Sequence, residues 1–165
     1  MGSGKSAVGR RLARGLRLGF FDSDEEIESR TGVDIPFIFE KEGEAGFRRR
    51  EQLVINELTA LDDIVLATGG GSVEDPDNRA RVASRGTVIY LHASVDHQLA
   101  RTRKGRERPL LQSGDPRETL EALMTVRDPL YRKIADIIVE TDNRQVHAIA
   151  REIEVRLARL EGGES

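Results

Sequence analysis

The first residues of the chain constrain its fold more than any other stretch. Gly4-Lys5-Ser6 supply the last three positions of the phosphate-binding signature G-x-x-x-x-G-K-[ST]. In such loops, backbone N–H groups surround phosphate oxygens, the lysine reaches the β- and γ-phosphates, and the hydroxyl of the final residue binds Mg²⁺. Apolar residues from Val8 to Leu16 follow at helical spacing. The sequence therefore predicts a phosphate loop backed by the positive end of a helix.

The start of that signature is missing. Its first glycine would precede Met1, as would the apolar strand that normally leads into the loop. This strand is usually central, so we expect a vacant central slot in the sheet, at a cost on the order of several kcal/mol from lost burial and unpaired backbone groups. A tag remnant or an ordinary turn would also explain an isolated Gly-Ser-Gly-Lys-Ser sequence, but the helical pattern after it favours the phosphate loop.

Length and composition are those of one globular domain. The chain has 165 residues, of which 38% are hydrophobic and 33% are charged. These values fit a single core rather than a disordered segment. No apolar run is long enough to cross a bilayer, and no signal-peptide pattern opens the chain. We therefore expect a cytoplasmic protein with no membrane partner.

The residue types exclude several kinds of chemistry. The chain has no cysteine, which excludes disulfides and thiolate sites. Its net charge of −3 offers no general attraction to nucleic acid. His92, His97 and His147 lie far apart in the sequence without metal-ligand spacing, so we expect them to be structural or surface residues.

Strand and helix patterns alternate along the chain. We expect strands at residues 19–22, 63–68, 87–91 and 137–139. Helices are expected after the phosphate loop and at about 22–30, 37–39, 44–61, 78–84, 94–102, 116–127 and 145–160. We expect Gly43 and Gly46 to break the helical pattern, and residues 128–131 to separate the 116–127 helix from a short helical turn. This alternation predicts one α/β domain over 1–165 with a parallel sheet covered on both faces.

Two acids follow the strand at 19–22. Asp22 and Asp24 lie at its carboxyl end, where ligands bind in parallel α/β sheets. Capping of the next helix would explain both residues without any ligand. Beside a phosphate loop, an acid here is also well placed to hold the water shell of Mg²⁺ or to orient a hydroxyl group.

Glycines and arginines elsewhere add two further candidates. Gly69-Gly70-Gly71 follow the strand at 63–68. They would form a loose turn or would let backbone N–H groups approach a ligand closely.

Arg48, Arg49 and Arg50 come at the start of the 44–61 helix, where cations oppose the helix dipole. A local inconsistency of this kind is commoner where an anion binds.

The most basic stretch runs from Arg101 to Leu111. A solvated charge run or a nucleic-acid patch would have this composition. The stretch lacks interleaved aromatic residues and lies between two helices of an otherwise acidic protein. We therefore favour a mobile lid that brings positive charge over phosphates.

Several segments occur in a specific order and at specific intervals. They are Gly2-Ser3-Gly4-Lys5-Ser6, Phe21-Asp22-Ser23-Asp24, Phe47-Arg48-Arg49 followed by Glu51, Gly69-Gly70-Gly71, Arg108-Pro109-Leu110-Leu111 and Arg127-Asp128-Pro129-Leu130-Tyr131. Each is weak alone, but the ordered series resembles the shikimate kinase family over nearly the whole chain. The resemblance implies a P-loop nucleoside monophosphate kinase-like, three-layer α/β/α fold with a parallel sheet, here without its first, central strand. It also implies substrate-binding helices at about 23–61 and a lid at about 102–114.

The resemblance implies a kinase reaction. ATP would donate its γ-phosphoryl group to the 3-hydroxyl of shikimate, an alcohol acceptor, giving shikimate 3-phosphate and ADP on the route to chorismate and the aromatic amino acids. One Mg²⁺ ion would bind with ATP. The family's pattern further implies a monomer whose partners are small-molecule substrates only.

The resemblance also assigns roles to single residues. Lys5, Asp24 and Arg108 would be catalytic, with Asp24 as the base and Arg108 closing from the lid on the transferring phosphate. Ser6 would bind Mg²⁺, and Asp22 would hold the ion through its water shell. The ATP site would comprise Gly2, Ser3, Gly4, Lys5, Ser6, Ala7, Arg101, Arg108 and Arg144, with Arg101 stacked on adenine. The shikimate site would comprise Asp24, Phe39, Phe47, Arg48, Gly69, Gly70, Gly71 and Arg127, with both of its arginines on the substrate carboxylate.

Two other functions are compatible with parts of this pattern. A kinase for another small carboxylate or polyol, such as gluconate, shares the loop but does not predict Arg48, Arg127 and the triple glycine together. A non-catalytic nucleotide-binding homologue would fit the incomplete loop, although the chemically important residues are retained. A start site assigned too late, at an internal Met, would also explain the incomplete loop and would give this sequence low stability and poor ATP affinity.

Overall fold

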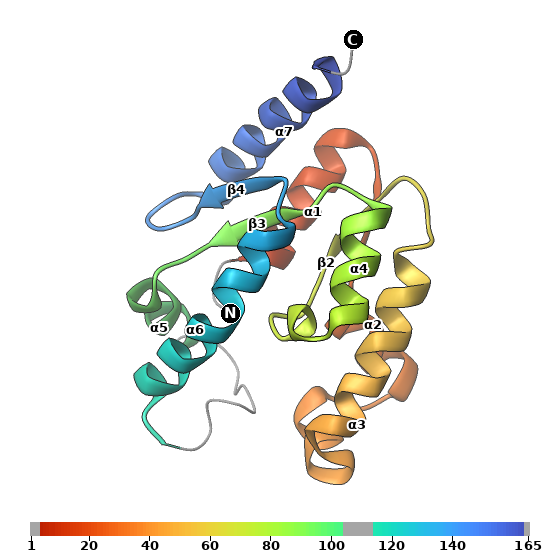
Figure 1. Cartoon of the computed structure of the whole chain (residues 1–165), viewed down its shortest axis with the longest axis vertical. Helices are drawn as coiled ribbons and strands as arrows, with labels where there is room; N and C mark the ends of the chain where they lie inside the picture. Colours follow the sequence, from red (N-terminus) through yellow and green to blue (C-terminus); the bar gives the residue numbers. More distant parts are fainter. Residues whose placement is uncertain (1–3, 104–113, 164–165) are drawn as a thin grey trace.

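The computed structural model describes residues 4–103 and 114–163, in which parallel strands alternate with helices (Figure 1). The strands are β1 (Gly19–Asp22), β2 (Ile64–Ala67), β3 (Ile89–His92) and β4 (Ile137–Glu140). The helices are α1 (Lys5–Leu16), α2 (Ser23–Thr31), α3 (Ile35–Leu58), α4 (Pro76–Arg85), α5 (Val95–Arg103), α6 (Pro116–Ile134) and α7 (Val146–Gly162), with a 3-10 turn, η1, at Ser72–Glu74.

The strands form two parallel pairs. β1 lies beside β2 with Asp22 opposite Ala67, and β3 lies beside β4 with His92 opposite Glu140. Within residues 4–103 and 114–163, no strand joins β2 to β3. The predicted parallel sheet with a vacant central slot is therefore confirmed.

One hydrophobic core lies where α1 and α7 cover the strands. Its buried side chains are Val8, Leu12, Ile137, Val139, Ile149 and Ile153, from α1, β4 and α7. Val65 of β2 and Ile89 of β3 pack against this cluster. The same core therefore contacts both strand pairs.

A second core lies between the β1–β2 pair and helices α2 and α3. It consists of Ile27, Ile38, Phe47, Val54 and Leu58. Phe21 of β1 and Leu66 of β2 pack against it. Successive residues of β2, Val65 and Leu66, thus serve different cores, as expected for a parallel strand that is covered on both faces.

Aspartates and prolines set the starts of several helices. The side chains of Asp22, Asp34, Asp75 and Asp115 accept hydrogen bonds from backbone N–H groups in the first turns of α2, α3, α4 and α6. A proline occupies the first turn of α3, α4 and α6, where its missing N–H has no helical partner to lose. These local signals explain why most element starts were predictable.

The prediction for the helix after Pro36 was partly wrong. α3 is interrupted only at Gly43, whose φ of 72° and ψ of 178° are not helical. Gly46 lies within the helix. Glycine is required there, because the side chain of Glu42 occupies the space that a Cβ at this position would need. A glycine can therefore remain in a helix for close packing rather than break it.

The predicted separation at residues 128–131 was also wrong. α6 continues through Pro129 to Ile134. Asp128 accepts a hydrogen bond from Arg132 Nε at 2.9 Å and another from the hydroxyl of Tyr90 at 2.7 Å. These contacts hold the helix around the proline and offset its missing backbone hydrogen bond.

None of the helices in the described ranges is long and apolar enough to cross a membrane.

Candidate active site

The carboxyl ends of β1 and β2 bring α2 beside the glycine-rich segment. The two strands are parallel and in register, so the residues after Asp22 and after Ala67 leave the sheet at the same edge. The backbone N–H of Gly69 donates a hydrogen bond of 3.0 Å to the hydroxyl of buried Ser23. This bond fixes residues 69–71 against the start of α2, where Asp24 lies.

Ser6 and Asp22 meet at the start of α1. The Ser6 hydroxyl donates a hydrogen bond to Oδ2 of Asp22. The other carboxylate oxygen of Asp22 accepts the N–H groups of Asp24 at 2.9 Å and Glu25 at 3.2 Å. One carboxylate thus caps α2 and faces the phosphate loop at the same time, so the capping role does not compete with a ligand role.

Gly4 and Arg101 lie together ahead of α1. Gly4 has a φ of 77°, a left-handed conformation that favours glycine. A Cβ placed on it would lie 2.6 Å from Nη1 of Arg101 in α5. Arg101 Nε lies 3.0 Å from Nε2 of His97, one helical turn earlier. We name Gly4, Lys5, Ser6, Asp22 and Arg101 the phosphate end of the site.

Two acidic side chains and a glycine meet beyond the end of β2: Asp24, Glu51 and Gly69. A Cβ placed on Gly69 would lie 2.8 Å from Oδ1 of Asp24 and 2.9 Å from Oε2 of Glu51. Real Cβ atoms do not approach other atoms so closely. Glycine at this position therefore allows two carboxyl groups to approach the backbone of the loop.

Glu51 is the most perturbed acid in this region. Its side chain is only 1% exposed, and its Oε1 accepts a hydrogen bond of 2.9 Å from Nη1 of Arg48. Oε2 has no hydrogen-bond partner among the residues that the structure describes. Burial, with the nearby charge of Asp24, raises the pKa of Glu51 to about 7, against the opposing effect of Arg48.

Arg48 links the carboxylates to the glycine loop. Besides Glu51, it pairs with Glu44 at 3.3 Å. Its guanidinium lies over Gly71, where an added Cβ would be 2.6 Å from Cζ. Burial acts to lower the pKa of Arg48, but the two glutamates outweigh burial and raise it. Arg48 is therefore a permanently charged group that faces the loop.

Arg127 brings a second guanidinium from α6. It is 4% exposed, and its Nε lies 3.6 Å from Oε1 of Glu74 without a hydrogen-bond partner in the described part of the chain. One turn later, the hydroxyl of Tyr131 donates a hydrogen bond to the carbonyl oxygen of Gly70. Burial raises the pKa of Tyr131 to about 12, so the hydroxyl remains a donor at neutral pH.

A cavity of about 440 Å³ opens beside these groups. Its lining includes Arg48, Glu51, Gly71 and Glu74. We name Asp24, Arg48, Glu51, Gly69–Gly71 and Arg127 the substrate end of the site. The substrate end combines two arginines with several acids around a glycine-rich backbone. This combination suits a ligand that carries both a carboxylate and hydroxyl groups.

Comparisons with known proteins identify the family. A family model described as shikimate kinase matches residues 1–158. A shikimate kinase of Pseudomonas entomophila (strain L48) is 58% identical over 160 residues, which cover 97% of this chain and 93% of that protein. The chain belongs to the shikimate kinase family. A relative from Pseudomonas syringae pv. tomato is 55% identical over the same share of both chains.

Solved structures from the family agree with this assignment. Shikimate kinase from Acinetobacter baumannii in complex with shikimate is 48% identical, with a TM-score of 0.93 over 96% of this chain and 89% of that chain. Shikimate kinase from Aquifex aeolicus is 36% identical, with a TM-score of 0.80 over 99% and 93% of the two chains. The predicted P-loop nucleoside monophosphate kinase-like α/β fold is thereby confirmed.

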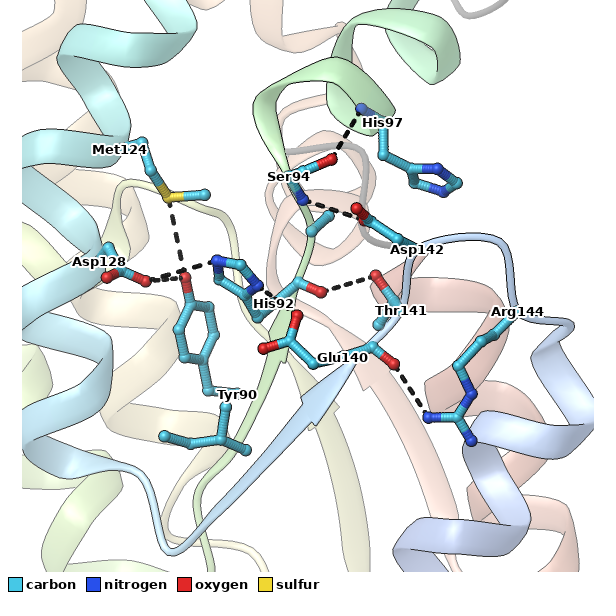
Figure 2. A network of polar contacts seen from close by, with 12 residues as sticks. Tyr90, His92, Ser94, His97, Met124, Asp128, Glu140, Thr141, Asp142 and Arg144 are labelled. Atoms are coloured by element: carbon cyan, nitrogen blue, oxygen red, sulfur yellow. Dashed lines mark hydrogen bonds and ion pairs between the residues drawn. The ribbon is translucent and has the colours of Figure 1, made fainter.

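A polar network joins α6 to β3 and β4 (Figure 2). Tyr90 of β3 donates to Asp128 of α6, next to Arg127. Nδ1 of His92 lies 2.6 Å from the carboxylate of Glu140 in β4. His92 thus links the β3–β4 pair, which agrees with the structural position expected for it.

The other predicted site residues are not among those of the two ends named above, or lie beyond the described part of the chain. Phe39 and Phe47 have ring centroids 5.1 Å apart and pack on the second core, beneath Arg48, whose Cζ lies 5.3 Å from the Phe47 centroid. Arg144 donates to the carbonyl oxygen of Glu140 at 2.9 Å and pairs with Glu152 at 2.7 Å, which holds it against β4 and α7. Gly2, Ser3, Arg108 and most of the 102–114 lid lie outside the described residues.

The structure adds four residues to which the sequence analysis assigned no role. They are Ser23, Glu51, Glu74 and Tyr131, which contact Gly69, Arg48, Arg127 and Gly70 respectively. Glu51 could have been found, because it lies three residues after Arg48 on one helix face. No local signal marks Glu74. Tyr131 lies in the segment 127–131 that the sequence analysis singled out, but its contact with Gly70 joins segments far apart in the sequence.

Proposed function

We propose that this protein transfers the γ-phosphoryl group of ATP to the 3-hydroxyl of shikimate, giving shikimate 3-phosphate and ADP. The observation that carries the proposal is the meeting of Asp24, Arg48 and Arg127 around residues 69–71. This substrate end adjoins the phosphate end through Asp22, which starts the helix that carries Asp24. The Acinetobacter baumannii structure, which is in complex with shikimate, supports the same substrate.

The two arginines would hold the carboxylate of shikimate. A guanidinium can bind a carboxylate through two parallel N–H groups, a geometry that lysine cannot reproduce. Nε of Arg127 has no hydrogen-bond partner among the described residues, and Arg48 lies over Gly71. Both groups are buried or half-buried, where such bonds are stronger than in water.

Asp24 would orient the reacting hydroxyl and accept its proton. Phosphoryl transfer needs positioning and charge neutralisation more than covalent chemistry, so one well-placed carboxylate is sufficient as a base. Residues 69–71 would contact the remaining hydroxyl groups through their backbone. Glu51 would keep Arg48 in place through their 2.9 Å hydrogen bond. Its carboxyl group also interacts electrostatically with that of Asp24, and besides burial the charge of Asp24 acts to raise the pKa of Glu51.

The phosphate end would bind the triphosphate of ATP. The amino end of α1 and Lys5 supply positive charge, and Arg101 lies beside Gly4, where it could stack on adenine. Ala7, Arg108 and Arg144 remain proposed members of the ATP site. Arg108 would act from the proposed lid.

A single Mg²⁺ ion fits the oxygen atoms at the phosphate end. Ser6 and Asp22 bring a hydroxyl and a carboxylate into contact, and residues 4–103 and 114–163 contain no larger cluster of acidic and histidine side chains that would hold a metal alone. Mg²⁺ commonly takes one or two protein oxygens and completes its shell with water and phosphates. When bound, the ion would neutralise charge on the phosphates. Ser6 and Asp22 would hold it.

The test is an ADP-release assay on the purified full chain with a panel of acceptors. We expect turnover with shikimate and none above background with gluconate or other polyol acids. Turnover with another acceptor but not with shikimate would contradict the proposal. We also propose that the protein is a cytoplasmic monomer and that its only partners are its small-molecule substrates. Sedimentation analysis would test the oligomeric state.

A further inference from the structure

One side-chain hydrogen bond joins α6 to the glycine-rich segment 69–71. Tyr131 lies one helical turn after Arg127, and its hydroxyl donates to the carbonyl oxygen of Gly70. Burial raises the pKa of Tyr131 to about 12, with further effects from the charges of Arg127, Glu74 and Glu51. The hydroxyl therefore lies close to the charged groups of the substrate end and stays protonated at neutral pH.

The carbonyl groups of the glycine-rich segment have two kinds of partner. That of Gly69 accepts from the N–H of Ser72 at 3.1 Å and from its hydroxyl at 2.7 Å. That of Gly71 accepts at 3.1 Å from the N–H three residues later. These bonds are local and close the turn η1. The carbonyl of Gly70 instead accepts from Tyr131, so its direction depends on how α6 packs against the segment.

The direction of this carbonyl sets the direction of a second backbone group. A peptide bond is planar, and in the trans form its C=O and N–H point in opposite directions. The C=O of Gly70 and the N–H of Gly71 belong to the same peptide group. The bond from Tyr131 therefore turns the N–H of Gly71 away from the Tyr131 hydroxyl. Arg48 lies beside the same residue, with Cζ 2.6 Å from the position of an added Cβ on Gly71, so this N–H belongs to the substrate end.

The peptide group between Gly70 and Gly71 has little local restraint. Its orientation depends on ψ of the residue before it and on φ of the residue after it, and both residues are glycine, which has no Cβ to restrict these angles. Gly71 has a φ of −87° and a ψ of −4°, values that most residues can adopt. Local backbone preference therefore does not select one orientation of this group, whereas a hydrogen bond to its carbonyl does.

We propose that Tyr131 is a positioning residue, which holds the Gly70–Gly71 peptide group so that its N–H faces a hydroxyl group of the acceptor. This inference rests on the proposed function, in which residues 69–71 contact the acceptor hydroxyl groups through their backbone. Tyr131 and Arg127 lie one turn apart on α6. One helix thus fixes both a carboxylate-binding charge and a hydroxyl-binding N–H, and with them the separation of the two groups that an acceptor has to present.

Tyr131→Phe and Tyr90→Phe form a matched pair of variants. Each removes one hydroxyl from an aromatic pair whose ring centroids lie 4.6 Å apart. The hydroxyl of Tyr90 donates to Asp128 and not to the glycine-rich segment (Figure 2). Both variants keep the packing of the rings, so a general effect on stability should be similar in the two. Only Tyr131→Phe should release the Gly70–Gly71 peptide group.

The first measurement needs no ligand. Backbone amide resonances and their relaxation dispersion are compared in the original chain and in the two variants, because dispersion detects exchange on the μs–ms timescale. We expect the amide of Gly71 to show a displaced resonance or new exchange in Tyr131→Phe but not in Tyr90→Phe. A folded Tyr131→Phe chain with an unchanged Gly71 amide would overturn the proposal, whether or not the chain phosphorylates shikimate.

The second measurement compares two ligands by titration calorimetry. Shikimate carries a carboxylate and hydroxyl groups, whereas cyclohexene carboxylate keeps the ring and the carboxylate but has no hydroxyl. We expect Tyr131→Phe to raise the Kd for shikimate about tenfold and to leave the Kd for cyclohexene carboxylate unchanged, because the arginines still bind the carboxylate. In turnover, the KM for shikimate should rise by about the same factor while the KM for ATP stays unchanged.

Two results in these assays would also overturn the proposal. One is equal weakening of both ligands by Tyr131→Phe, and the other is an equal effect of Tyr90→Phe on shikimate binding. Either would show that the hydroxyl of Tyr131 supports the fold and not the direction of one N–H group. Failure of the original chain to bind shikimate would contradict the proposed function and this inference together. Normal binding with either of the two results above would contradict this inference alone.

Discussion

The two ends of the candidate active site hold charge in opposite ways. At the phosphate end, positive character comes from the amino end of α1 and from the half-buried side chains of Lys5 and Arg101. At the substrate end, Arg127 and Glu51 are almost completely buried, and Arg48 is paired with two glutamates. The phosphate end therefore relies largely on backbone groups near solvent, whereas the substrate end relies on side-chain charges that are shielded from solvent.

This difference predicts how each end responds to mutation. Backbone groups near solvent cost little to maintain, so changes at the phosphate end should affect ATP binding without affecting folding. Buried charges depend on their partners, and removal of one partner leaves the other uncompensated. The substrate end should therefore couple ligand binding to stability and to pH.

The largest expected effect is on the proposed base. Asp24→Asn keeps the size of the side chain and removes its ability to accept a proton, so kcat should fall about 10³-fold. Steady-state kinetics with saturating shikimate and ATP measure this effect, and circular dichroism confirms the fold. Near-normal turnover in the folded variant would exclude Asp24 as the base.

The next effect concerns stability at the buried acid. The pKa of Glu51 rises from 4.5 to about 7 on folding, so the folded state holds the proton more tightly than the unfolded state. The protonation of Glu51 therefore adds to the free energy of unfolding. This contribution is fully present below pH 4.5 and is lost as the pH rises through about 7. Glu51→Gln, which mimics the protonated acid, should match the original chain near pH 4.5 and exceed its free energy of unfolding by up to about 3 kcal/mol at pH 8.

Urea unfolding across this pH range measures the difference. Glu44→Gln is the matched control, because Glu44 also pairs with Arg48 but its side chain is 51% exposed. A difference between Glu51→Gln and the original chain that does not vary with pH would show that Glu51 does not titrate on folding.

A somewhat smaller effect is expected at the carboxylate-binding arginines. Arg48→Lys or Arg127→Lys retains the charge but loses the bidentate geometry, so the KM for shikimate should rise about 50-fold while the KM for ATP changes little. Arg132→Lys on the same helix as Arg127 is the control, since its side chain is 45% exposed. Equal rises in both KM values would contradict the separation of the two ends.

The smallest effect is expected at the phosphate end. Arg101→Ala removes the proposed stacking on adenine, so the KM for ATP should rise roughly fivefold with unchanged stability. Arg117→Ala is the control, because that side chain is 48% exposed and pairs with Asp96 instead. A larger effect on the KM for shikimate than on that for ATP would place Arg101 at the wrong end of the site.

Much of the fold was predictable from local patterns. The strand at Gly19–Asp22 and the aspartate that caps α2 are marked by hydrophobic runs and capping residues within a few positions. The same approach failed at Gly46 and Pro129. Both residues disfavour helices by propensity. At Gly46 the side chain of Glu42 leaves no space for a Cβ, and around Pro129 the hydrogen bonds of Asp128 link the helix to Tyr90 and Arg132.

The sequence by itself determined the family, the order of strands and helices, and the residue types that can bind a phosphate and a carboxylate. These follow from spacing within short segments, which local backbone chemistry dictates. Only the tertiary structure decided which groups share a site: Glu51 beside Asp24, Glu74 beside Arg127, and Tyr131 on the carbonyl oxygen of Gly70. Such pairings join segments far apart in the sequence, and burial in the folded chain sets their charges and pKa values.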